Sequence, residues 1–430
     1  MTDRLRALFF DHLSIARGKY LPASKIGDGS SRFARAVFGV HYDRDLLLDA
    51  PHAKVRDGAP DMELRWQAAD IRQGWEPNTS VVLGDLYGDD GAPLPLCPRR
   101  ALKRAIADWQ SHGLSPKLGI ELEAYALQGG EDGRLRPYDA PGGVVYGTGP
   151  FADPMRINDV IWNKAHEMGF RLDLITAEYD SPQFEYTLSF DDALSAVDDV
   201  VLFRQMAREI ALDHGVVLTF LPKPLSEMGG SGMHINFSFW DAEGKNALAT
   251  GERGGPDHLN DLSRGCLAGL VHHHTGLAGL IAPTTGSYRR LQPSSMSGYW
   301  KNWGGDHRGV TTRVSGEGGQ KARLEHRMAD ASANPYTAAA AVLQAARLGY
   351  EARLDLPPME TGDGFDKVDA KIGTAENLRG AIRDLVADTA LVDAVGRELV
   401  ENHAFMKERE FRKTRDMEPD ALLDFYVWFV

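Results

Sequence analysis

The chain has very little cysteine and no long apolar run. Its two cysteines, Cys97 and Cys266, lie far apart and without metal-ligand spacing. This scarcity is typical of a reducing compartment and excludes both a disulfide framework and a thiolate zinc site. No uncharged apolar stretch approaches the roughly 20 residues of a membrane helix, and the N-terminal segment lacks the apolar core and cleavage site of a signal peptide. We therefore expect a soluble, cytoplasmic protein.

The chain also lacks an excess of positive charge. Its 48 lysines and arginines are outnumbered by 61 aspartates and glutamates, which gives a formal net charge of −13. This balance argues against nucleic acid or an anionic membrane as the main partner and leaves a small-molecule substrate open. The sequence has no Walker GxxxxGK[ST] motif and no strand-linked GxGxxG. Any nucleotide must therefore be held in another way.

A length of 430 residues with a hydrophobic fraction of 43% suits a globular chain of two domains. The first hundred residues predict short strands and turns, and a proline-rich stretch then leads into a helix over 99–112. We therefore place one domain at 1–97 and another at 98–430. Past the boundary, strands and helices mix in the manner of an α+β fold with one sheet face open to a ligand. We expect strands at 117–127, 183–188, 216–224, 231–240, 309–314 and 323–328, and helices at 156–168, 190–214, 258–280, 335–352 and 375–398.

Carboxylates alternate with apolar residues in the first of these strands. Glu121 and Glu123 point to one side, while Ile120, Leu122 and Ala124 point to the other, because side chains in a strand repeat every two residues. Taken alone, such a pattern is most often an exposed edge strand. Two carboxylates this close repel each other and raise each other's pKa unless a cation lies between them.

Further acidic residues and one histidine occupy similar positions. Glu178 and Glu185 flank a proline turn, and His234 follows a glycine-rich turn on the polar side of the strand 231–240. Glu325 lies between two arginines in the strand 323–328. A set of oxygen ligands with one nitrogen suits Mg²⁺ or Mn²⁺.

Arginines supply the opposite charge. Arg323, Glu325 and Arg327 share one face of their strand, and the guanidinium group matches carboxylate and phosphate in a bidentate fashion. A solvated strand would carry this pattern without any function. Together with the metal-ligand candidates, it describes phosphoryl transfer from a nucleotide to an acid.

Eight motifs follow one another along the chain, in the order GIELEAY, AEYDSPQFE, FLPKP, GGSGMHINFS, PTTGSYRRLQP, DHRGVTTRV, KARLEHR and ANPY. This ordered set resembles the glutamine synthetase family, in particular its glutamate–amine ligase branch, which makes γ-glutamylamides and γ-glutamylpolyamines. The resemblance implies a small N-terminal β-grasp domain and a large catalytic domain whose curved antiparallel sheet is backed by helices. It also implies a homo-oligomer of stacked rings, expected to be a dodecamer, with active sites between subunits.

The resemblance also assigns roles to individual residues. It implies one metal ion held by Glu123, Glu178 and Glu185, and a second held by Glu121, His234 and Glu325. It places glutamate against Gly230, Arg290 and Arg327, close to Glu123, His234 and Arg308. For ATP and the transferred phosphoryl group it implies Arg308, Arg313, Lys321 and Arg323, with Asn236 and Ser238 on the nucleotide side. Arg308, Arg313 and Glu178 would be the catalytic residues.

The sequence departs from the family on the ammonium side. The family carries a flap glutamate six residues after the arginine that Arg290 matches, and here Met296 stands at that position. The N-terminal acidic loop is also missing, although Asp43 or Asp45 could replace it. Losing a carboxylate weakens an ammonium pocket and frees volume, so we expect an organic amine as acceptor. The candidate acceptor residues are Tyr146, Met296, Trp300 and Asp43.

Other readings stay open at this point. An ammonium-using glutamine synthetase needs an acid from elsewhere, and a non-catalytic regulatory relative should have lost metal ligands, none of which is missing. A guanidino kinase of related fold would need a cysteine inside the motifs, and neither cysteine lies in one. The C-terminal segment LLDFYVWFV is too apolar for a free tail, so we expect it to dock on a neighbouring subunit.

Overall fold

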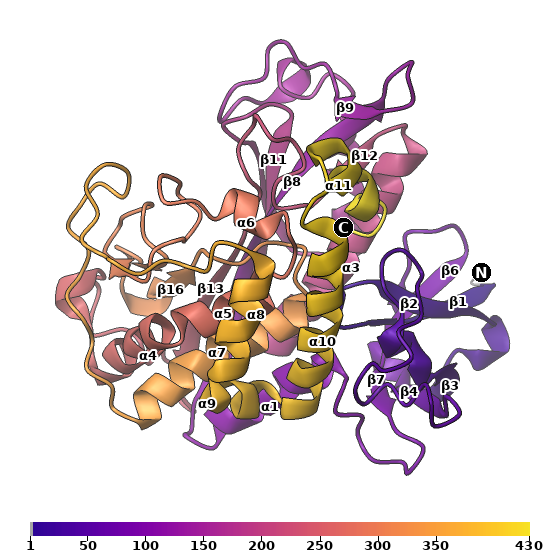
Figure 1. Ribbon diagram of the computed structural model, residues 1–430, viewed down its shortest axis with the longest axis horizontal. Coiled ribbons are helices and arrows are strands. Elements are labelled where there is room, and N and C mark those ends of the chain that lie inside the picture. The colour runs from indigo at the N-terminus through magenta and orange to yellow at the C-terminus, as the bar shows by residue number, and fades with distance from the viewer. Residues whose placement is uncertain (1–2) are drawn as a thin grey trace.

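The computed structural model describes residues 3–430 and begins with a region built from two small sheets (Figure 1). One sheet has the order β2-β1-β6-β5 and the other the order β3-β4-β7. Arg6 attaches this region to the following body, because it donates to both carboxylate oxygens of Glu209 at 2.7 and 2.8 Å. The strands are β1 (Arg4–Phe10), β2 (Ala16–Pro22), β3 (Gly29–Ala34), β4 (Asp61–Trp66), β5 (Arg72–Gln73), β6 (Thr79–Leu83) and β7 (Asp85–Tyr87).

The larger body contains a nine-stranded sheet with the order β10-β11-β8-β13-β16-β15-β14. β9 and β12 also pair with β8, the longest strand of the sheet. Almost all its pairs are antiparallel, the exception being β14 with β15. The strands are β8 (Ser115–Gly129), β9 (Leu135–Pro137), β10 (Leu172–Ala177), β11 (Gln183–Asp192), β12 (Val217–Thr219), β13 (Met233–Trp240), β14 (Trp303–Gly304), β15 (Thr312–Val314) and β16 (Leu324–His326).

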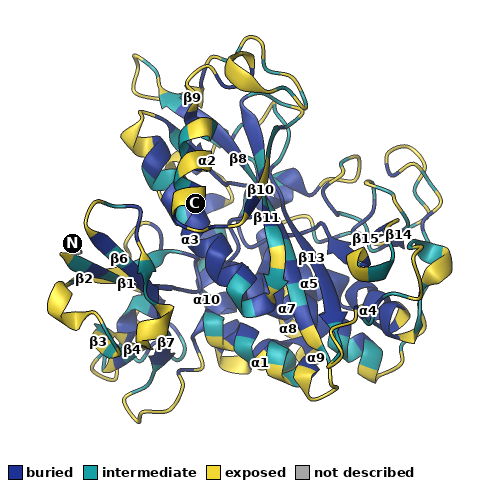
Figure 2. Ribbon diagram, turned by 180° about the vertical axis from the view of Figure 1, so that it is seen from behind, coloured by how far each residue is buried: buried dark blue, intermediate teal, exposed yellow. Residues whose placement is uncertain are grey.

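Helices cover one face of this sheet, and their buried sides form the core (Figure 2). None of the helices within residues 3–430 has the length and apolar character needed to cross a membrane. The helices are α1 (Pro98–Gln110), α2 (Ile157–Glu167), α3 (Ala193–Asp213), α4 (Asp261–His272), α5 (His274–Ile281), α6 (Ser287–Arg290), α7 (Pro335–Glu351), α8 (Leu378–Ala387), α9 (Thr389–Val395), α10 (Arg397–Thr414) and α11 (Pro419–Tyr426).

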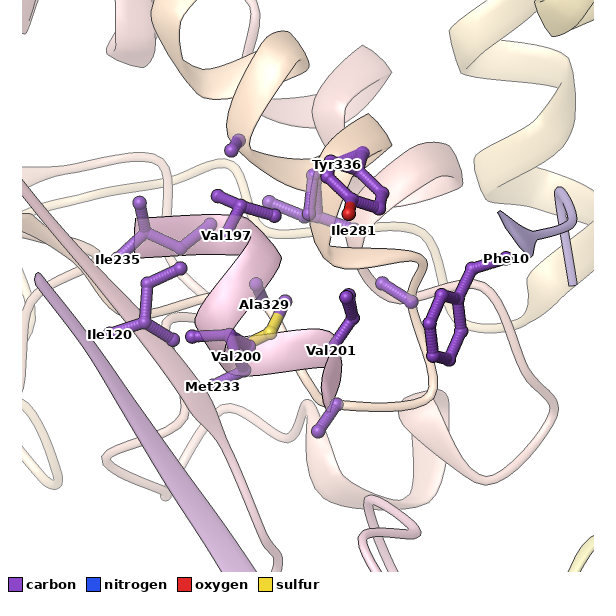
Figure 3. Packing of buried hydrophobic residues seen from close by; sticks show 14 of the residues in the cluster. Phe10, Ile120, Val197, Val200, Val201, Met233, Ile235, Ile281, Ala329 and Tyr336 are labelled. Atoms are coloured by element: carbon purple, nitrogen blue, oxygen red, sulfur yellow. The ribbon is translucent and has the colours of Figure 1, made fainter. Parts of the chain in front are cut away.

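Apolar side chains on one face of β8 and β13 join the sheet to the helices. Ile120 and Ile235, which are register partners on the two strands, are buried and lie beside Val197 and Val200 of α3 (Figure 3). Burial of an aliphatic side chain of this size contributes about 1.5–3 kcal/mol. Because side chains alternate along a strand, anchoring these residues in the core turns the intervening polar residues to the opposite face.

The fold is α+β as expected, with differences in its elements. The predicted helix at 258–280 is divided at His273 into α4 and α5, and the one at 375–398 is divided at Asp388, whose side chain caps α9 by accepting from the N–H of Leu391. The predicted strand at 216–224 is limited to the short β12, since the FLPKP stretch leaves the sheet. The sequence reasoning missed the edge strand β10 and the helices α10 and α11.

The apolar C-terminal segment packs on its own subunit. Leu422, Leu423 and Tyr426 are buried, and the Tyr426 hydroxyl donates to Oε1 of Glu410 in α10 at 2.6 Å. These contacts account for the buried residues of the segment, while Trp428 is 57% exposed, so docking on a neighbouring subunit stays a prediction. Both cysteines are free and buried.

Candidate functional site

The open face of the sheet collects the acidic residues and His234. Strand pairing places Glu121 opposite His234, Glu123 opposite Glu185, and Glu325 opposite Asn236. Opposed residues on neighbouring antiparallel strands point to the same face with their Cβ atoms about 5 Å apart. The register alone therefore brings these side chains together.

His234 lies at the centre of this group. Its Nδ1 is 2.9 Å from Oε2 of Glu121 and 3.7 Å from Oε1 of Glu325, and its Nε2 is 3.5 Å from Oε1 of Glu123. The structure forms two sets whose ligand atoms lie within 4.8 Å of one another, namely Glu121 with His234 and Glu325, and Glu123 with Glu185 and His234. The first set is the one expected for the second metal ion. In the other, His234 replaces the expected Glu178.

Burial, together with the neighbouring charges, changes the ionisation of this group. Burial raises the pKa of Glu185 to about 7, with the charge of Glu121 adding to the effect. Burial likewise raises the pKa of Glu178, and the neighbouring Glu123 adds to it, so Glu178 lies beside the group. Burial opposes charging of His234, but Glu121 and Glu123 outweigh it and raise the pKa of the imidazole. A crowded set of oxygen donors with one nitrogen fits a divalent cation such as Mg²⁺ or Mn²⁺.

Glu325 connects this group to two arginines. Its carboxylate accepts from Nη1 of Arg327 and from Nη1 of Arg313, the latter at 2.8 Å. Although burial opposes ionisation, Arg327, His234 and Arg313 together lower the pKa of Glu325. Nε of Arg327 is buried and has no hydrogen-bond partner within residues 3–430. Leaving a buried N–H donor unpaired costs free energy unless an anion accepts its hydrogen bond.

The glycine-rich turn before β13 packs directly on Arg290. A Cβ atom on Gly230 would lie 2.6 Å from Cγ of Arg290, so this position requires glycine. Arg290 donates to the main-chain oxygens of Arg327 and Met328 at 3.1 and 2.7 Å. Gly230, Arg290 and Arg327 are thus neighbours, as the resemblance implies. Sequence reasoning missed Gln183, whose amide donates to the oxygen of Gly230 at 3.0 Å.

The two arginines of the DHRGVTTRV motif differ in their surroundings. Arg308 is exposed in the loop before β15. Its charge partly offsets the rise in the pKa of Glu178 and adds to the lowering of the pKa of Asp306, so it lies near both carboxylates. Arg313 is only partly exposed. Its Nε donates to Oδ1 of Asp306 at 2.9 Å, and its Nη1 donates to Glu325. Asp306 was not singled out from the sequence, because its partner comes from the following strand.

A cavity of about 310 Å³ borders the carboxylates at the β13 side, and we call it the nucleotide cavity. Its wall includes the expected Asn236, Ser238, Lys321 and Arg323, together with Glu121 of the metal-ligand candidates. Arg313 was also expected on the nucleotide side, but it is not part of this wall. The wall residues that the sequence reasoning missed include Lys117, Asp173, Phe190, Glu317 and Gln320.

Aromatic and charged groups give the nucleotide cavity its character. Phe190 is 55% exposed and stacks on Trp240 with 6.3 Å between ring centroids, while Nζ of Lys117 lies 4.8 Å from the Trp240 centroid. Glu317 pairs with both Arg323 and Lys321. The cavity therefore offers an aromatic surface and cations, which suits a purine ring with attached phosphates.

The residues expected on the acceptor side are dispersed. Tyr146 is 70% exposed, and its N–H donates to the oxygen of Ala177, the residue before Glu178, at 2.9 Å. Met296 is 49% exposed in a turn whose Gly298 packs against the main chain of Met328. Trp300 is held by its indole N–H, which donates to the oxygen of Pro293 at 2.9 Å.

The N-terminal acids are already paired within the subunit. Asp43 and Asp45 both bind Nζ of Lys413 in α10, with 2.5 Å between Nζ and Oδ2 of Asp45. Burial is outweighed by Lys413, so the pKa of Asp43 is lowered. Trp303 is buried and its indole N–H donates to the oxygen of Pro357 at 2.8 Å, so it is a core residue.

Comparison with known proteins agrees with this geometry. An acidic sheet face with arginines on one flank and a nucleotide-sized cavity beside it defines a phosphoryl-transferring enzyme. Residues 95–426 match the family model of the glutamine synthetase catalytic domain. The chain belongs to the glutamine synthetase family and is an ATP-dependent carbon–nitrogen ligase.

Its relatives include enzymes named for different nitrogen substrates. A glutamine synthetase of Halobacterium salinarum is 30% identical over 85% of this chain and 84% of its own length. The gamma-glutamylethanolamide synthetase GlnA4 of Streptomyces coelicolor is 31% identical over 82% of this chain and 76% of its own. A glutamate–isopropylamine ligase of a Pseudomonas species is 29% identical over 96% and 92%. Among solved structures, GmaS without ligand superposes with a TM-score of 0.82 at 26% identity, over 97% of this chain and 94% of that one.

Proposed function

We propose that this protein uses ATP to phosphorylate the γ-carboxylate of glutamate and couples the product to a primary organic amine. The observation that carries the proposal is the acceptor side, where Met296 stands in place of an acid and exposed Tyr146 and Tyr179 adjoin Glu178. An ammonium ion needs a compact anionic pocket, whereas an amine with a carbon chain needs room and apolar contacts. The printed names of two relatives, an ethanolamide synthetase and an isopropylamine ligase, support the same choice.

The residues of the open face fit divalent ions. The candidates to hold Mg²⁺ or Mn²⁺ are Glu121, Glu123, Glu178, Glu185, His234 and Glu325. When bound, such ions neutralise phosphate charge and polarise the phosphoryl group.

The arginines divide between the two substrates. Arg290 and Arg327 would bind glutamate beside Gly230. The buried Nε of Arg327, which has no partner among the described residues, is free to donate to it. Arg308 and Arg313 lie where charge develops as an oxygen of the γ-carboxylate bonds to the terminal phosphorus of ATP and ADP leaves. Lys321 and Arg323 border the nucleotide cavity together with Asn236 and Ser238.

The second half-reaction forms the amide. The amine nitrogen attacks the acyl carbon, the bond to the phosphate oxygen breaks, and inorganic phosphate leaves. The nitrogen must give up a proton, and Glu178, whose pKa is raised by burial and by Glu123, is the group we assign to receive it. A carboxylate with a raised pKa is a better proton acceptor than one at its ordinary value.

The proposal includes an assembly of stacked rings, expected to be a dodecamer, with active sites shared between subunits. Membership of the family supports it. In such an assembly Asp43 and Asp45 would approach a neighbouring site while still bound to Lys413, whose positive charge neutralises one of their two negative charges. This pairing further weakens the case for an acidic ammonium pocket.

The test is phosphate release from ATP with Mg²⁺ and glutamate, measured against ammonium, methylamine, ethylamine, ethanolamine, putrescine and an aromatic amine. The products are identified by mass. We expect kcat/KM for at least one organic amine to exceed that for ammonium about 10-fold or more. A preference for ammonium would identify an ordinary glutamine synthetase and overturn the acceptor assignment. Silence with every acceptor would favour another acid substrate or a regulatory relative without catalysis.

A further inference from the structure

Arg308 has no side-chain contact that fixes its position. It is exposed in the loop between β14 and β15, residues 305–311, which we call the arginine loop. The side chains of this loop that form hydrogen bonds or ion pairs include Asp306 and His307, and within residues 3–430 none of these bonds involves the guanidinium group of Arg308. The main chain on either side of Arg308 therefore decides where the guanidinium group lies.

His307 ties the main chain on both sides of Arg308 together. Its Nδ1 accepts the N–H of Gly309 at 2.9 Å, so in a neutral imidazole the proton is on Nε2. Nε2 then donates to the oxygen of Gly362 at 2.7 Å. One ring thus closes the turn around Arg308 and attaches it to a second segment, residues 360–374, which we call the backing segment.

The two main chains also touch directly at a pair of glycines. A Cβ atom on Gly364 would lie 2.8 Å from Cα of Gly309, and one on Gly309 would lie 2.9 Å from Cα of Gly364. Gly364 also has a φ of +82°, which favours glycine. Neither residue could carry a side chain without a shift of the arginine loop.

The end of the backing segment pairs with the chain that leads into β14. The N–H of Lys301 donates to the oxygen of Ile372 at 2.8 Å, and the N–H of Thr374 donates to the oxygen of Tyr299 at 2.9 Å. Both segments lie on the side of the larger body away from the N-terminal region (Figure 1). The backing segment therefore supports the arginine loop and the residues before it.

The buried carboxylate of Glu360 gives the backing segment its shape. Its Oε1 accepts the N–H groups of Gly362 at 3.0 Å and Asp369 at 2.7 Å, and its Oε2 accepts that of Ala370 at 3.2 Å. Hydrogen bonds to a charged acceptor are stronger than those between neutral groups. A single side chain thus closes the loop from 360 to 370 and fixes Gly362, the partner of His307.

Glu360 also reaches the far end of the arginine loop through Asn302. Nδ2 of this buried asparagine donates to Oε2 of Glu360 at 3.0 Å, and its Oδ1 accepts the N–H of Thr311 at 3.0 Å. The N–H of Glu360 donates to the oxygen of Trp303 at 3.0 Å. The arginine loop is therefore held at its end through Asn302 and in its middle through His307, and both connections lead to Glu360.

We propose that Glu360 and His307 are positioning residues that hold Arg308 in place for phosphoryl transfer. The inference rests on the proposed function, because it takes Arg308 as a group that meets the developing charge. The oxygens of Glu360 and the ring nitrogens of His307 are occupied by protein groups, so both residues act through the main chain of 307–309. A cation stabilises a transition state best when it is held in place before the reaction, and an exposed arginine on a loose loop loses that advantage.

The experiment measures phosphate release by the full-length enzyme with ATP, Mg²⁺, glutamate and whichever acceptor of the panel is used best. His307→Phe keeps a ring and removes both hydrogen bonds, whereas His307→Gln can still donate to Gly362. Glu360→Gln keeps the shape but brings an amide against N–H donors. His166→Phe, at an exposed histidine of α2, is the matched control. Each change is also made together with Arg308→Ala, which completes a double-mutant cycle.

We expect His307→Phe and Glu360→Gln each to lower kcat about 10-fold, with KM for glutamate within about 3-fold of wild type. His307→Gln should stay within about 3-fold of the wild-type kcat. Combined with Arg308→Ala, the same changes should lower kcat by less than about 2-fold further, because no guanidinium group is left to position. The control should have no effect in either background.

Equal losses with and without Arg308→Ala would mean that these residues support the fold in general, and would overturn the inference. Wild-type kcat in His307→Phe would overturn it as well. If Glu360→Gln does not fold, as judged by circular dichroism, the half-buried His307 decides the question alone. A preference for ammonium would overturn the acceptor assignment and leave this comparison intact. Wild-type kcat in Arg308→Ala, or no turnover with any acceptor, would remove the proposed role of Arg308 and the inference with it.

Discussion

Arg313 of β15 donates from Nη1 to Oε2 of Glu325 at 2.8 Å, between residues that are register partners on adjacent antiparallel strands. The other oxygen of the same carboxylate accepts from Arg327 and lies 3.7 Å from Nδ1 of His234. One side chain thus touches a metal-ligand candidate and arginines from both substrate groups. Its removal should affect the whole reaction rather than one substrate.

Glu325→Gln keeps the shape of the side chain and removes its charge. We expect phosphate release to fall at least about 100-fold with every acceptor, because Arg313 and Arg327 lose their ionic partner and the ion site loses a carboxylate. Activity is followed by phosphate release, and Mn²⁺ binding by electron paramagnetic resonance. Glu376→Gln, the same change at an exposed glutamate outside the nucleotide cavity, is the matched control and should keep near wild-type turnover. Full activity of Glu325→Gln would remove Glu325 from the ion site.

The carboxylate face could be predicted because its information is local. Glu121 and Glu123 alternate with buried Ile120 and Leu122, so a period of two fixes their face before any partner strand is known. The turn before His234 is likewise marked by its glycines. Which carboxylates would share an ion followed only from the family resemblance, and the strand order was not predicted, since pairing depends on contacts distant in sequence.

Features that depend on tertiary approach could not be predicted. Glu317 neutralises Arg323 and Lys321 across a turn, and Asp43 meets Lys413 across 370 residues of chain. Phe190 has an apolar side chain that gives no sign of its exposure to a cavity. Helix ends at His273 and Asp388 were also missed, because a capping side chain and a short irregular turn outweigh continuous helix propensity.

Arg327 and Arg323 should separate the two substrates. Arg327→Lys removes the unfilled Nε donor and should raise KM for glutamate about 10-fold or more, with KM for ATP changed less than about 3-fold. Arg323→Lys, the same change beside the nucleotide cavity, should show the reverse pattern. Initial rates over a grid of both substrate concentrations give the constants. Equal effects of the two variants on both constants would contradict the division.

Divalent ions should stabilise the folded enzyme through the crowded carboxylates. Mg²⁺ at 100 times its Kd adds about 2.7 kcal/mol to the free energy of unfolding. Glu185→Gln removes one repelling charge next to Glu123 and Glu121, so without ions this variant should melt at a higher temperature than wild type. It should also gain less from Mg²⁺. Calorimetric melting with EDTA and with Mg²⁺ gives the comparison, and an identical Mg²⁺ gain in both proteins would exclude Glu185 from the ion site.

Buried histidines should make the protein lose stability in mild acid. Burial lowers the pKa of His274 and His326 to about 3 and that of His403 to about 4. An unfolded histidine titrates near 6.5, so below that pH the unfolded chain binds more protons and the free energy of unfolding falls. Each histidine contributes a slope of about 1.4 kcal/mol per pH unit until the pH reaches its folded pKa.

The variant His403→Gln isolates the contribution of one histidine to this pH dependence of the free energy of unfolding. A glutamine amide can still donate to the oxygen of Gly279, which His403 contacts through Nε2 at 2.9 Å. Denaturant unfolding from pH 7.5 to 5.0 should show a shallower loss for the variant than for wild type, because the other titrating groups cancel in the difference. Parallel curves would mean that His403 is protonated in the folded protein.

Met296→Glu places an acid at the flap position and should move the acceptor preference toward ammonium. Met296 is exposed, so the new carboxylate needs no buried partner and should not destabilise the fold. The position matches the flap acid of the family, and a negative charge there favours a small cation over a carbon chain, so kcat/KM for ammonium should rise about 10-fold while that for the best organic amine falls. Met296→Gln is the control of equal size without charge and should lower the organic amine rate without raising the ammonium rate. If both variants keep the wild-type ratio, the acceptor preference is set by residues other than Met296.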